Sequence, residues 1–315
     1  MRLRLALDEG LGLAGPVLVR HPALDTDLSA LPDCVIETPD IRVAEHFGGT
    51  HSVNPENHAE YAAVLVVLPR AKDLARDLIA TSFVLAPRVL VDGQKTDGVD
   101  SLWRACRERA EVDGSVTKAH GRLFWMTGSA EAFADWLYVP PDAYGFTLAP
   151  GVFSADGIDP GSYALAEVMP ERLSGRVIDL GAGWGYLSAV AEARGADAID
   201  MVEADATALA CAEANTQNTT PHWADATRWQ APEKAQHVIM NPPFHAGRKG
   251  TPELGQAFIA TAARSLLPGG TLWMVANRHL PYEETLARHF GHVTELAGPP
   301  GTEGFKLFQA TRPKR

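Results

Sequence analysis

Two consecutive prolines, Pro242 and Pro243, follow the apolar run Val238–Met240 and a single asparagine. Neither proline has an N–H to donate to a sheet ladder, and each fixes φ at roughly −65°, so a strand must end here. In an open α/β sheet, ligands bind beyond the carboxyl ends of the strands. This strand end carries an amide, Asn241, and an aromatic ring, Phe244. Together these groups suit a planar ligand that bears an NH₂ group.

Strands alternate with helices throughout the second half of the chain. A turn is expected at Pro268–Gly270. Alternation of this kind predicts a mostly parallel sheet that is covered by helices on both faces. The predicted elements are strand Arg176–Leu180, helix Gly185–Arg194, strand Ala198–Val202, helix Ala206–Asn215, a short strand before Asp225, the strand ending at Met240, helix Pro252–Leu267, strand Thr271–Ala276, helix Tyr282–Phe290 and strand Phe305–Ala310.

The first half also has an α/β pattern, but it shows no glycine-rich turn between a strand and a helix. Residues 139–151, rich in proline and glycine, separate the two halves. We therefore expect two domains, residues 1–149 and 150–315, and no internal repeat is visible between them. The elements predicted in the first half are strands at Val17–Val19, Ala62–Leu68, Arg88–Val91 and Arg122–Met126, and helices at Arg70–Ala80 and Asp97–Arg109.

The composition is that of a globular protein with two packed cores. The chain has 315 residues, of which 46% are hydrophobic and 21% charged. The longest apolar run, Tyr61–Leu68, is far shorter than the roughly 20 residues of a membrane span. The three cysteines, Cys34, Cys106 and Cys211, make no CxxC pair and are typical of buried thiols in a reducing compartment. We expect a cytoplasmic protein without membrane contact.

The net charge of −11 argues against tight, non-specific binding of naked duplex nucleic acid. Phosphate contacts supply much of such affinity, and they require basic side chains. A small basic strip, such as Arg248 with Arg278, is still compatible with this charge. The histidines near Glu45 lie in a polar loop without the spacing of metal ligands, so no metal site is expected.

A glycine-rich turn lies between the first strand and first helix of the second half. Its pattern is D-x-G-x-G-x-G, formed by Asp179, Gly181, Gly183 and Gly185. A dinucleotide fingerprint requires G-x-G-x-x-G, but the third residue after Gly183 is Tyr186. The turn instead resembles that of class I S-adenosylmethionine methyltransferases. Without a pyrophosphate to bind, Asp179 is placed to attract the cationic end of such a cofactor, directly or through water.

Two further acids follow the next two strands. Glu203 ends the strand Ala198–Val202, where a carboxylate can accept both hydroxyls of a ribose. Asp225, with Ala226 beside it, follows a short third strand and is placed to accept from an adenine amino group. Each acid alone would fit a solvated loop equally well. The order of glycine turn, two acids and Pro-Pro strand end favours a cofactor site.

The strand end at Asn241 supplies the groups expected to position an acceptor amine. Asn241 Oδ1 and the carbonyl of Pro242 could accept both hydrogens of the amine, so that its lone pair points to the methyl group. Orientation and fixed dipoles then provide the rate enhancement, without a strong base. Pro243 directs Phe244, whose ring could stack on a base removed from its helix. His245 could contact the base or phosphate, or cap the loop.

Several segments resemble bacterial ribosomal RNA guanine-N2 methyltransferases, and most closely the small-subunit 16S subgroup. The similar segments are Pro150–Ser162, the Asn241–His245 loop, Val275–Tyr282 and Gly304–Phe308. The resemblance is strong over residues 150–312 and fainter over residues 60–130. Trp184 departs from the family, which usually has a smaller or different residue there.

This resemblance implies a Rossmann-like class I methyltransferase domain with a mostly parallel seven-stranded sheet and an antiparallel last strand. It also implies a preceding, degenerate α/β copy of that fold, which has lost the cofactor and docks RNA. The implied partners are S-adenosylmethionine and ribosomal RNA, either as free RNA or as part of an assembled small subunit. The protein is expected to be monomeric. The implied site residues are Asn241, Pro242, Pro243 and Phe244 for catalysis; Asp179, Gly181, Gly183, Gly185, Glu203, Asp225, Ala226 and Asn241 for the cofactor; and His245, Arg248 and Arg278 for the substrate.

Two other functions remain open at this stage. One is N-methylation of a protein glutamine amide or of an adenine N6 amine. The acidic surface fits a protein substrate, but such enzymes more often have tyrosine in place of Phe244. The other is a cofactor-binding RNA chaperone without turnover. The presence of Asp179, Glu203 and Asn241 argues against it, because a retired site need not keep them.

Overall fold

The structure is a computed structural model that describes residues 1–31, 33–51, 61–141, 145–243, 245–246, 249–250 and 252–314. It divides into two compact units, Met1–Pro140 and Pro141–Arg315. The division lies ahead of the domain boundary at residues 149 and 150 that the sequence predicts. Among the described residues, no helix is long and apolar enough to cross a membrane.

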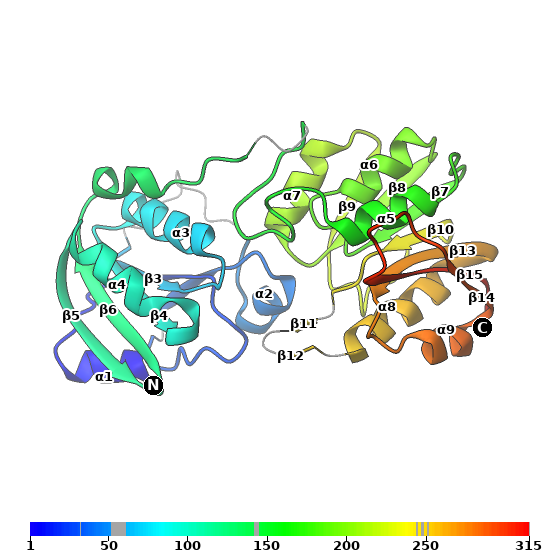
Figure 1. The fold of residues 1–315 in the computed structure, drawn as a ribbon. Coiled ribbons are helices and arrows are strands. Elements are labelled where there is room, and N and C mark those ends of the chain that lie inside the picture. Colours follow the sequence, from blue (N-terminus) through cyan, green and yellow to red (C-terminus); the bar gives the residue numbers. More distant parts are fainter. Residues whose placement is uncertain are drawn as a thin grey trace. The chain divides into compact units, whose positions relative to one another are not determined.

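The second unit is built on a seven-stranded sheet (Figure 1). Its strands are β7 (Arg176–Leu180), β8 (Ala198–Glu203), β9 (Thr219–Trp223), β10 (Ala235–Met240), β13 (Leu266–Asn277), β14 (Phe290–Leu296) and β15 (Phe305–Pro313). They lie in the order β14-β15-β13-β10-β7-β8-β9. The pairs from β13 to β9 are parallel, whereas β15 runs antiparallel to both of its neighbours. The sheet expected from the family resemblance is thereby confirmed.

Helices cover both faces of this sheet (Figure 1). One face packs against α5 (Pro160–Val168), α6 (Tyr186–Ala193) and α7 (Ala206–Asn215), and the other against α8 (Pro252–Ser265) and α9 (Glu283–His289). Side chains alternate between the two faces along a strand. In β7, Val177 accordingly packs on the side of α5, and Ile178 on the side of α8. This two-sided burial explains why the central strands are continuous apolar runs.

Most predicted elements of the second unit are confirmed, and three differ. Helix α5 and the edge strand β14 were not predicted. The turn expected at Pro268–Gly270 lies inside strand β13, where the pairing with β10 shifts register between Ala235 and His237. A bulge therefore absorbs the proline and glycines that the sequence presents as a turn.

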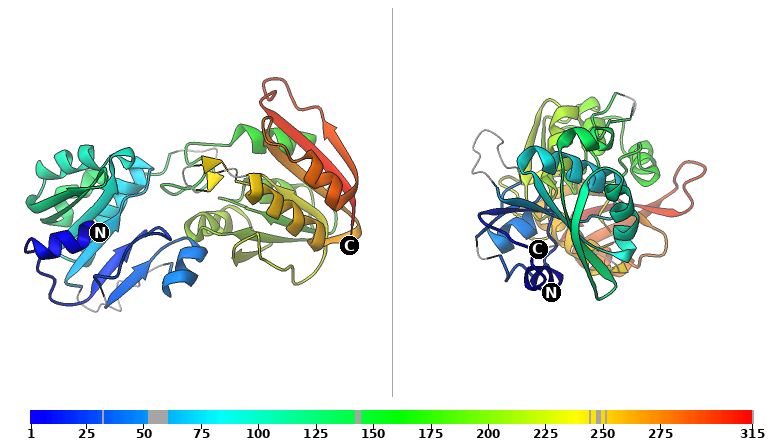
Figure 2. Two further views of the ribbon diagram at one scale, coloured as in Figure 1. Left: turned by 90° about the horizontal axis from the view of Figure 1, so that it is seen from below. Right: turned by 90° about the vertical axis from the view of Figure 1, so that its left-hand side faces the viewer.

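The first unit is built on a six-stranded sheet of order β2-β1-β3-β4-β6-β5. Long, twisted β5 and β6 are seen in the right-hand view of Figure 2. The strands are β1 (Val17–Arg20), β2 (Cys34–Glu37), β3 (Ala63–Val67), β4 (Arg88–Gln94), β5 (Glu111–Lys118) and β6 (Gly121–Thr127). The helices are α1 (Arg2–Asp8), α2 (Ile41–Phe47), α3 (Lys72–Leu85) and α4 (Val99–Arg107), with short 3₁₀ segments at Lys95–Asp97 and Ala130–Trp136.

The two sheets share one topology. Strands β2, β1, β3, β4, β6 and β5 follow the same order as β8, β7, β10, β13, β15 and β14, and every pair has the same relative direction. Where the second unit has β9, the described residues of the first unit form a single parallel bridge between Glu37 and Thr50. They form no helix between β1 and β2, where the second unit has α6.

The turn after β1 keeps part of the corresponding backbone geometry. His21 follows β1 with φ of 60° and donates its N–H to Glu37 O, as Gly181 follows β7 with φ of 76° and donates to Val202 O. A histidine thus stands where the second unit has the first glycine of its turn. At this place the described residues of the first unit show neither a glycine turn nor a helix, the two features that can offer backbone N–H groups to a ligand.

Candidate active site

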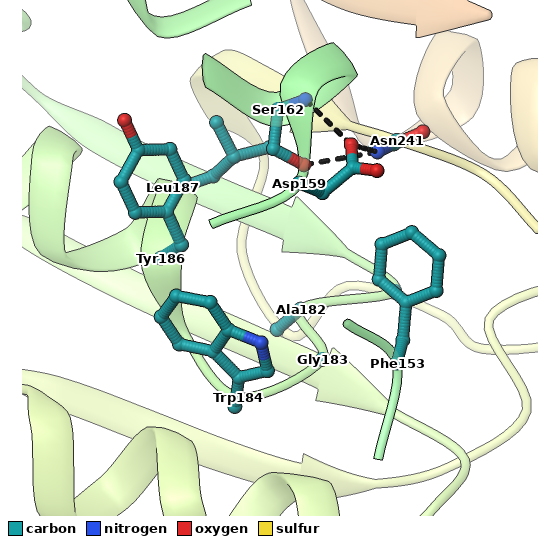
Figure 3. A pocket seen from close by; sticks show the side chains of 10 residues that line it. Phe153, Asp159, Ser162, Ala182, Gly183, Trp184, Tyr186, Leu187 and Asn241 are labelled. Atoms are coloured by element: carbon teal, nitrogen blue, oxygen red, sulfur yellow. Dashed lines mark hydrogen bonds between the residues drawn. The ribbon is translucent and has the colours of Figure 1, made fainter. Parts of the chain in front are cut away.

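The carboxyl ends of β7, β8 and β10 meet at one edge of the second sheet. A cavity lies there, between the glycine turn, the start of α5 and the end of β10 (Figure 3). The residues that line it are Phe153, Asp159, Ser162, Gly181, Ala182, Gly183, Trp184, Tyr186, Leu187 and Asn241.

The glycines of the turn serve different purposes. Gly183 and Gly185 both have left-handed φ values, 55° and 91°. A Cβ on Gly185 would lie 2.9 Å from the Cα of Ala212, so this glycine lets α6 pack closely on α7. A Cβ on Gly183 would meet no atom within 4 Å. Because Gly183 lines the cavity, its bare backbone leaves room for a ligand to approach the chain.

Glu203 supports this turn from the end of β8. Its two carboxylate oxygens accept from the backbone N–H groups of Gly183 and Asp205, each at 2.9 Å. Burial raises the pKa of Glu203, although these two hydrogen bonds oppose the rise. The carboxylate therefore couples the glycine turn to the next strand. Its expected contact with a ribose stays a prediction.

Asp179 lies beneath the turn and is completely buried. Its Oδ2 accepts from the hydroxyl of Ser188 at 2.7 Å, whereas its Oδ1 has no hydrogen-bond partner. Burial, together with the negative charge of Glu203, raises the pKa of Asp179 to about 7. Asp179 is not among the residues that line the cavity. Its expected attraction for the cationic end of a cofactor stays a prediction.

Asn241 lies at the end of β10 and faces the cavity (Figure 3). Its Nδ2 donates to Asp159 Oδ2 and to Ser162 Oγ, both at 2.9 Å. The amide oxygen points away from these two groups (Figure 3). The sequence identified the amide but missed Asp159 and Ser162. An aspartate before Pro160 is a helix-start signal that could have located them.

The two prolines that end β10 differ in their exposure to solvent. Pro242 is buried and Pro243 is exposed. The predicted contacts of Phe244 and Arg248 lie outside the described residues. The backbone of His245 belongs to β11 (His245–Ala246), which pairs antiparallel with β12 (Lys249–Gly250). The loop after the prolines therefore begins with a short hairpin.

The structure does not bring Asp225, Ala226 or Arg278 into the cavity. Burial acts to raise the pKa of Asp225, but hydrogen bonds from Thr227 outweigh it and hold that pKa below its usual range. Asp225 Oδ1 accepts from the Thr227 N–H at 2.9 Å and from its hydroxyl at 2.6 Å. Ala226 is buried in the core on the side of α8. These hydrogen bonds fix the Asp225 carboxylate at the strand edge, and its adenine contact stays a prediction.

Arg278 follows β13 and is committed to contacts within the second unit. It donates to the carbonyls of Glu303 and Phe305, each at 2.6 Å, and to Glu295 at 3.1 Å. The guanidinium thus ties the loop before β15 to the edge strand β14. A contact with substrate would have to use the donors that these bonds leave over.

An aromatic cluster that the sequence did not reveal forms one wall of the cavity. Trp184 is buried and packs against Phe146, with ring centroids 5.0 Å apart. Asn215 donates to the carbonyls of both Trp184 and Thr147, at 2.8 and 2.9 Å. The tryptophan that departs from the family therefore anchors the segment leading to α5. Among the described residues, no group of three or more His, Cys, Asp or Glu side chains could hold a metal ion.

Comparisons with known proteins agree with this architecture. Residues 143–309 match the family model described as the methyltransferase small domain. The chain is 31% identical over 292 residues to the ribosomal RNA small subunit methyltransferase C of Hahella chejuensis, covering 86% of this chain and 83% of the relative. It is 33% identical over 262 residues to the protein of that name from Shewanella baltica, covering 78% and 75%.

One solved structure has the same fold along nearly the whole chain. It is the T. thermophilus 16S rRNA N2 G1207 methyltransferase in complex with AdoMet and guanosine. The match covers 98% of this chain and 91% of that chain, with a TM-score of 0.74 and 23% sequence identity. The likeness supports the class I methyltransferase fold and the presence of a second α/β unit before it.

Replacement of the buried acid, Asp179→Asn, should stabilise the protein increasingly as the pH rises. The native state keeps a proton on Asp179 up to about pH 7, whereas the unfolded chain releases it at about pH 4. The free energy of unfolding of the parent therefore falls between about pH 4 and about pH 7 and stays constant above pH 7. An amide does not ionise, so the variant avoids this fall. The expected gain at neutral pH is on the order of a few kcal/mol.

Thermal unfolding at a series of pH values measures this effect. The difference in Tm between variant and parent should widen from about pH 4 to about pH 7 and then stay constant. The exposed carboxylate of Asp156 provides a matched control, and Asp156→Asn should show no such widening. A constant difference for Asp179→Asn at all pH values would contradict the raised pKa.

Proposed function

The chain belongs to the ribosomal RNA small subunit methyltransferase C family, and we propose that it transfers a methyl group from S-adenosylmethionine to the exocyclic N2 amine of a guanine in 16S ribosomal RNA. The T. thermophilus enzyme of the same fold acts at N2 of G1207 and was solved with AdoMet and guanosine. The observation that carries the proposal is the Asn241 amide, whose oxygen is left without a described partner beside the glycine turn.

Groups in the cavity and around it support a site for S-adenosylmethionine. The open face of Gly183 admits a ligand next to the backbone, and the unpartnered Oδ1 of Asp179 lies beneath the turn. Glu203 offers its remaining lone pairs at the end of β8, as the acid that holds a ribose does in related folds. Asp225, on the same sheet edge, is held in the ionised form that accepts an amino group. When bound, the cofactor supplies an electrophilic methyl group on a sulfonium centre.

The chain's own contribution to the reaction is orientation. The amide oxygen of Asn241 and the carbonyl of Pro242 accept the two N–H groups of the amine, which directs the nitrogen lone pair away from the conjugated ring. Pro242 and Pro243 keep these acceptors rigid, because their φ angles are fixed. The proton leaves after transfer, when the amine is more acidic, so no dedicated base is needed. The stacking role of Phe244 stays a prediction.

We further propose that the first unit docks ribosomal RNA through the surface of α4. The Trp103 ring packs against two guanidinium groups, with the Cζ of Arg107 at 4.9 Å and the Cζ of Arg122 at 4.2 Å from the ring centroid. Arg104 and Arg107 are exposed in the last turn of the helix. Stacked guanidinium planes can receive unpaired bases as well as phosphates. The exposed Arg104 and Arg107 support the proposal, because they supply local positive charge in a chain whose net charge is −11.

The partner and location proposals follow from the family. The RNA is reached as free 16S RNA or within an assembled small subunit, and the protein acts as a monomer. Free cysteines support the cytoplasm as the site of action: Cys106 and Cys211 are buried thiols, and burial raises the pKa of Cys106 to about 12. An inert thiol of this kind has no structural need for an oxidising compartment.

A labelling experiment tests the proposed function. The protein is incubated with radiolabelled S-adenosylmethionine and, separately, undermodified small subunits, free 16S RNA, tRNA and release factors. We expect label in N2-methylguanine of 16S RNA, identified after nuclease digestion. Label in protein would replace the proposal with a glutamine methyltransferase, and label in adenine would replace it with an adenine N6 enzyme. Cofactor binding without any label would identify a non-catalytic scaffold.

Removal of the amide, Asn241→Ala, should abolish transfer and spare the cofactor. The oxygen acts on the acceptor amine, so the turnover number should fall by about 100-fold or more. Affinity for S-adenosylmethionine, measured by isothermal titration calorimetry, should stay within about threefold of the parent. A comparable loss of both quantities would mean that Asn241 mainly holds the cofactor.

Charge reversal on α4, Arg104→Glu with Arg107→Glu, should weaken binding of 16S RNA and leave cofactor affinity unchanged. Loss of two phosphate contacts should reduce the slope of log affinity against log salt by about 1 to 2. Filter binding across a salt series measures this slope. As a control, Arg288→Glu changes an exposed arginine on α9 of the second unit and should not alter it. An unchanged slope for the α4 variant would move RNA docking to another surface.

A further inference from the structure

The side-chain amide of Asn241 is held in one orientation by two acceptors on α5. Its Nδ2 carries two hydrogens, and both are used: one reaches Asp159 Oδ2 and the other Ser162 Oγ, each at 2.9 Å. An ionised carboxylate accepts hydrogen bonds and cannot donate them. The NH₂ end of the amide must therefore face Asp159, and the oxygen must face the opposite way (Figure 3).

The acceptors themselves are rigid. Asp159 is the N-cap of α5 and accepts the backbone N–H of Ser162 at 2.8 Å, on the same Oδ2 that receives Asn241. Pro160 follows at the first helical position, where its fixed φ suits the helix. The next turn is anchored in the core by Ala164 and Leu165, both fully buried. A side chain held by such an element keeps its position at little further cost in entropy.

We propose that Asp159 and Ser162 form an orienting clamp that fixes the Asn241 amide with only its oxygen facing the acceptor, and that this polarity selects an NH₂-bearing base. The inference rests on the proposed function, whose reacting amine it explains. A flipped amide would present its own N–H groups to the N–H groups of the amine and repel them. Asp159 acts through Asn241, so it is a positioning residue.

Asp159 could serve only as the cap of α5, without any role in specificity. Two variants of Asp159 separate a capping role from a clamping role. Serine and asparagine are about as good as aspartate at an N-cap. Asp159→Asn keeps an acceptor oxygen that can still reach Asn241. Asp159→Ser can cap Ser162, but its hydroxyl lies closer to the backbone and is not an obligatory acceptor. The clamp predicts different activities for these two variants, whereas capping predicts equal ones.

The first measurement is steady-state methyl transfer to the RNA substrate. The turnover number of Asp159→Ser should fall about tenfold or more below that of Asp159→Asn. The two variants should share one cofactor affinity, and both should keep the Tm of the parent. Asp40→Ser is the matched control, since Asp40 caps α2 in the first unit and touches no catalytic amide. Equal activity of the two Asp159 variants, or a loss confined to cofactor affinity, would overturn the clamp.

The second measurement does not depend on turnover. In protein labelled on asparagine nitrogen, the NH₂ resonances of Asn241 are those absent from the Asn241→Ala variant. Their hydrogens should exchange slowly with solvent in the parent and in Asp159→Asn, and rapidly in Asp159→Ser. Fast exchange in the parent would refute the clamp. A parent with slow exchange but no methyl transfer would instead refute the proposed function and leave the clamp established.

Discussion

The parallel pairing of β7 with β8 and β10 is the constraint on which the candidate site depends. Parallel strands bring their carboxyl ends to one edge, so residues far apart in sequence become neighbours: the glycine turn after β7, Glu203 at the end of β8 and Asn241 after β10. The prolines after Asn241 end β10, because they cannot extend its ladder of backbone hydrogen bonds. Helix α5 completes the cavity, because its N-cap reaches Asn241 from the chain before β7.

The two units share one strand topology but differ in the turn after the first strand. Six strands keep the same order and direction in both units, so the fold is maintained by the burial pattern of each strand. The first unit lacks a counterpart of α6 in its described residues and has His21 in place of the first glycine. A sheet without a helix N-terminus behind its first turn offers no row of free N–H groups. The described residues of the first unit therefore present no such row after β1.

The central elements could be predicted from the sequence because each carries a local signal. Strands β7, β8 and β10 are short apolar runs, and α7 begins at an aspartate cap. The edge strands β2, β5 and β14 were missed because solvent covers one side and most of their residues are only partly buried. The contacts of Asp159 and Ser162 with Asn241 span about eighty residues and have no local signature. The family resemblance implied the repeat, but the residues themselves do not show it, because topology and not residue identity is what the two units share.

The site also shows where the chain departs from rules that favour stability. Asp179 buries a carboxyl group with one unpartnered oxygen, and burial raises its pKa to about 7. Gly183 exposes backbone in a left-handed conformation with nothing packed against it, and Asn241 leaves its oxygen without a described partner. The buried, unpartnered oxygen of Asp179 costs free energy, because a buried polar group without a hydrogen bond is unfavourable. All three lie within one turn, one strand end and the cavity between them. This coincidence distinguishes the site from the packed strands around it, where side chains fill both faces of the sheet.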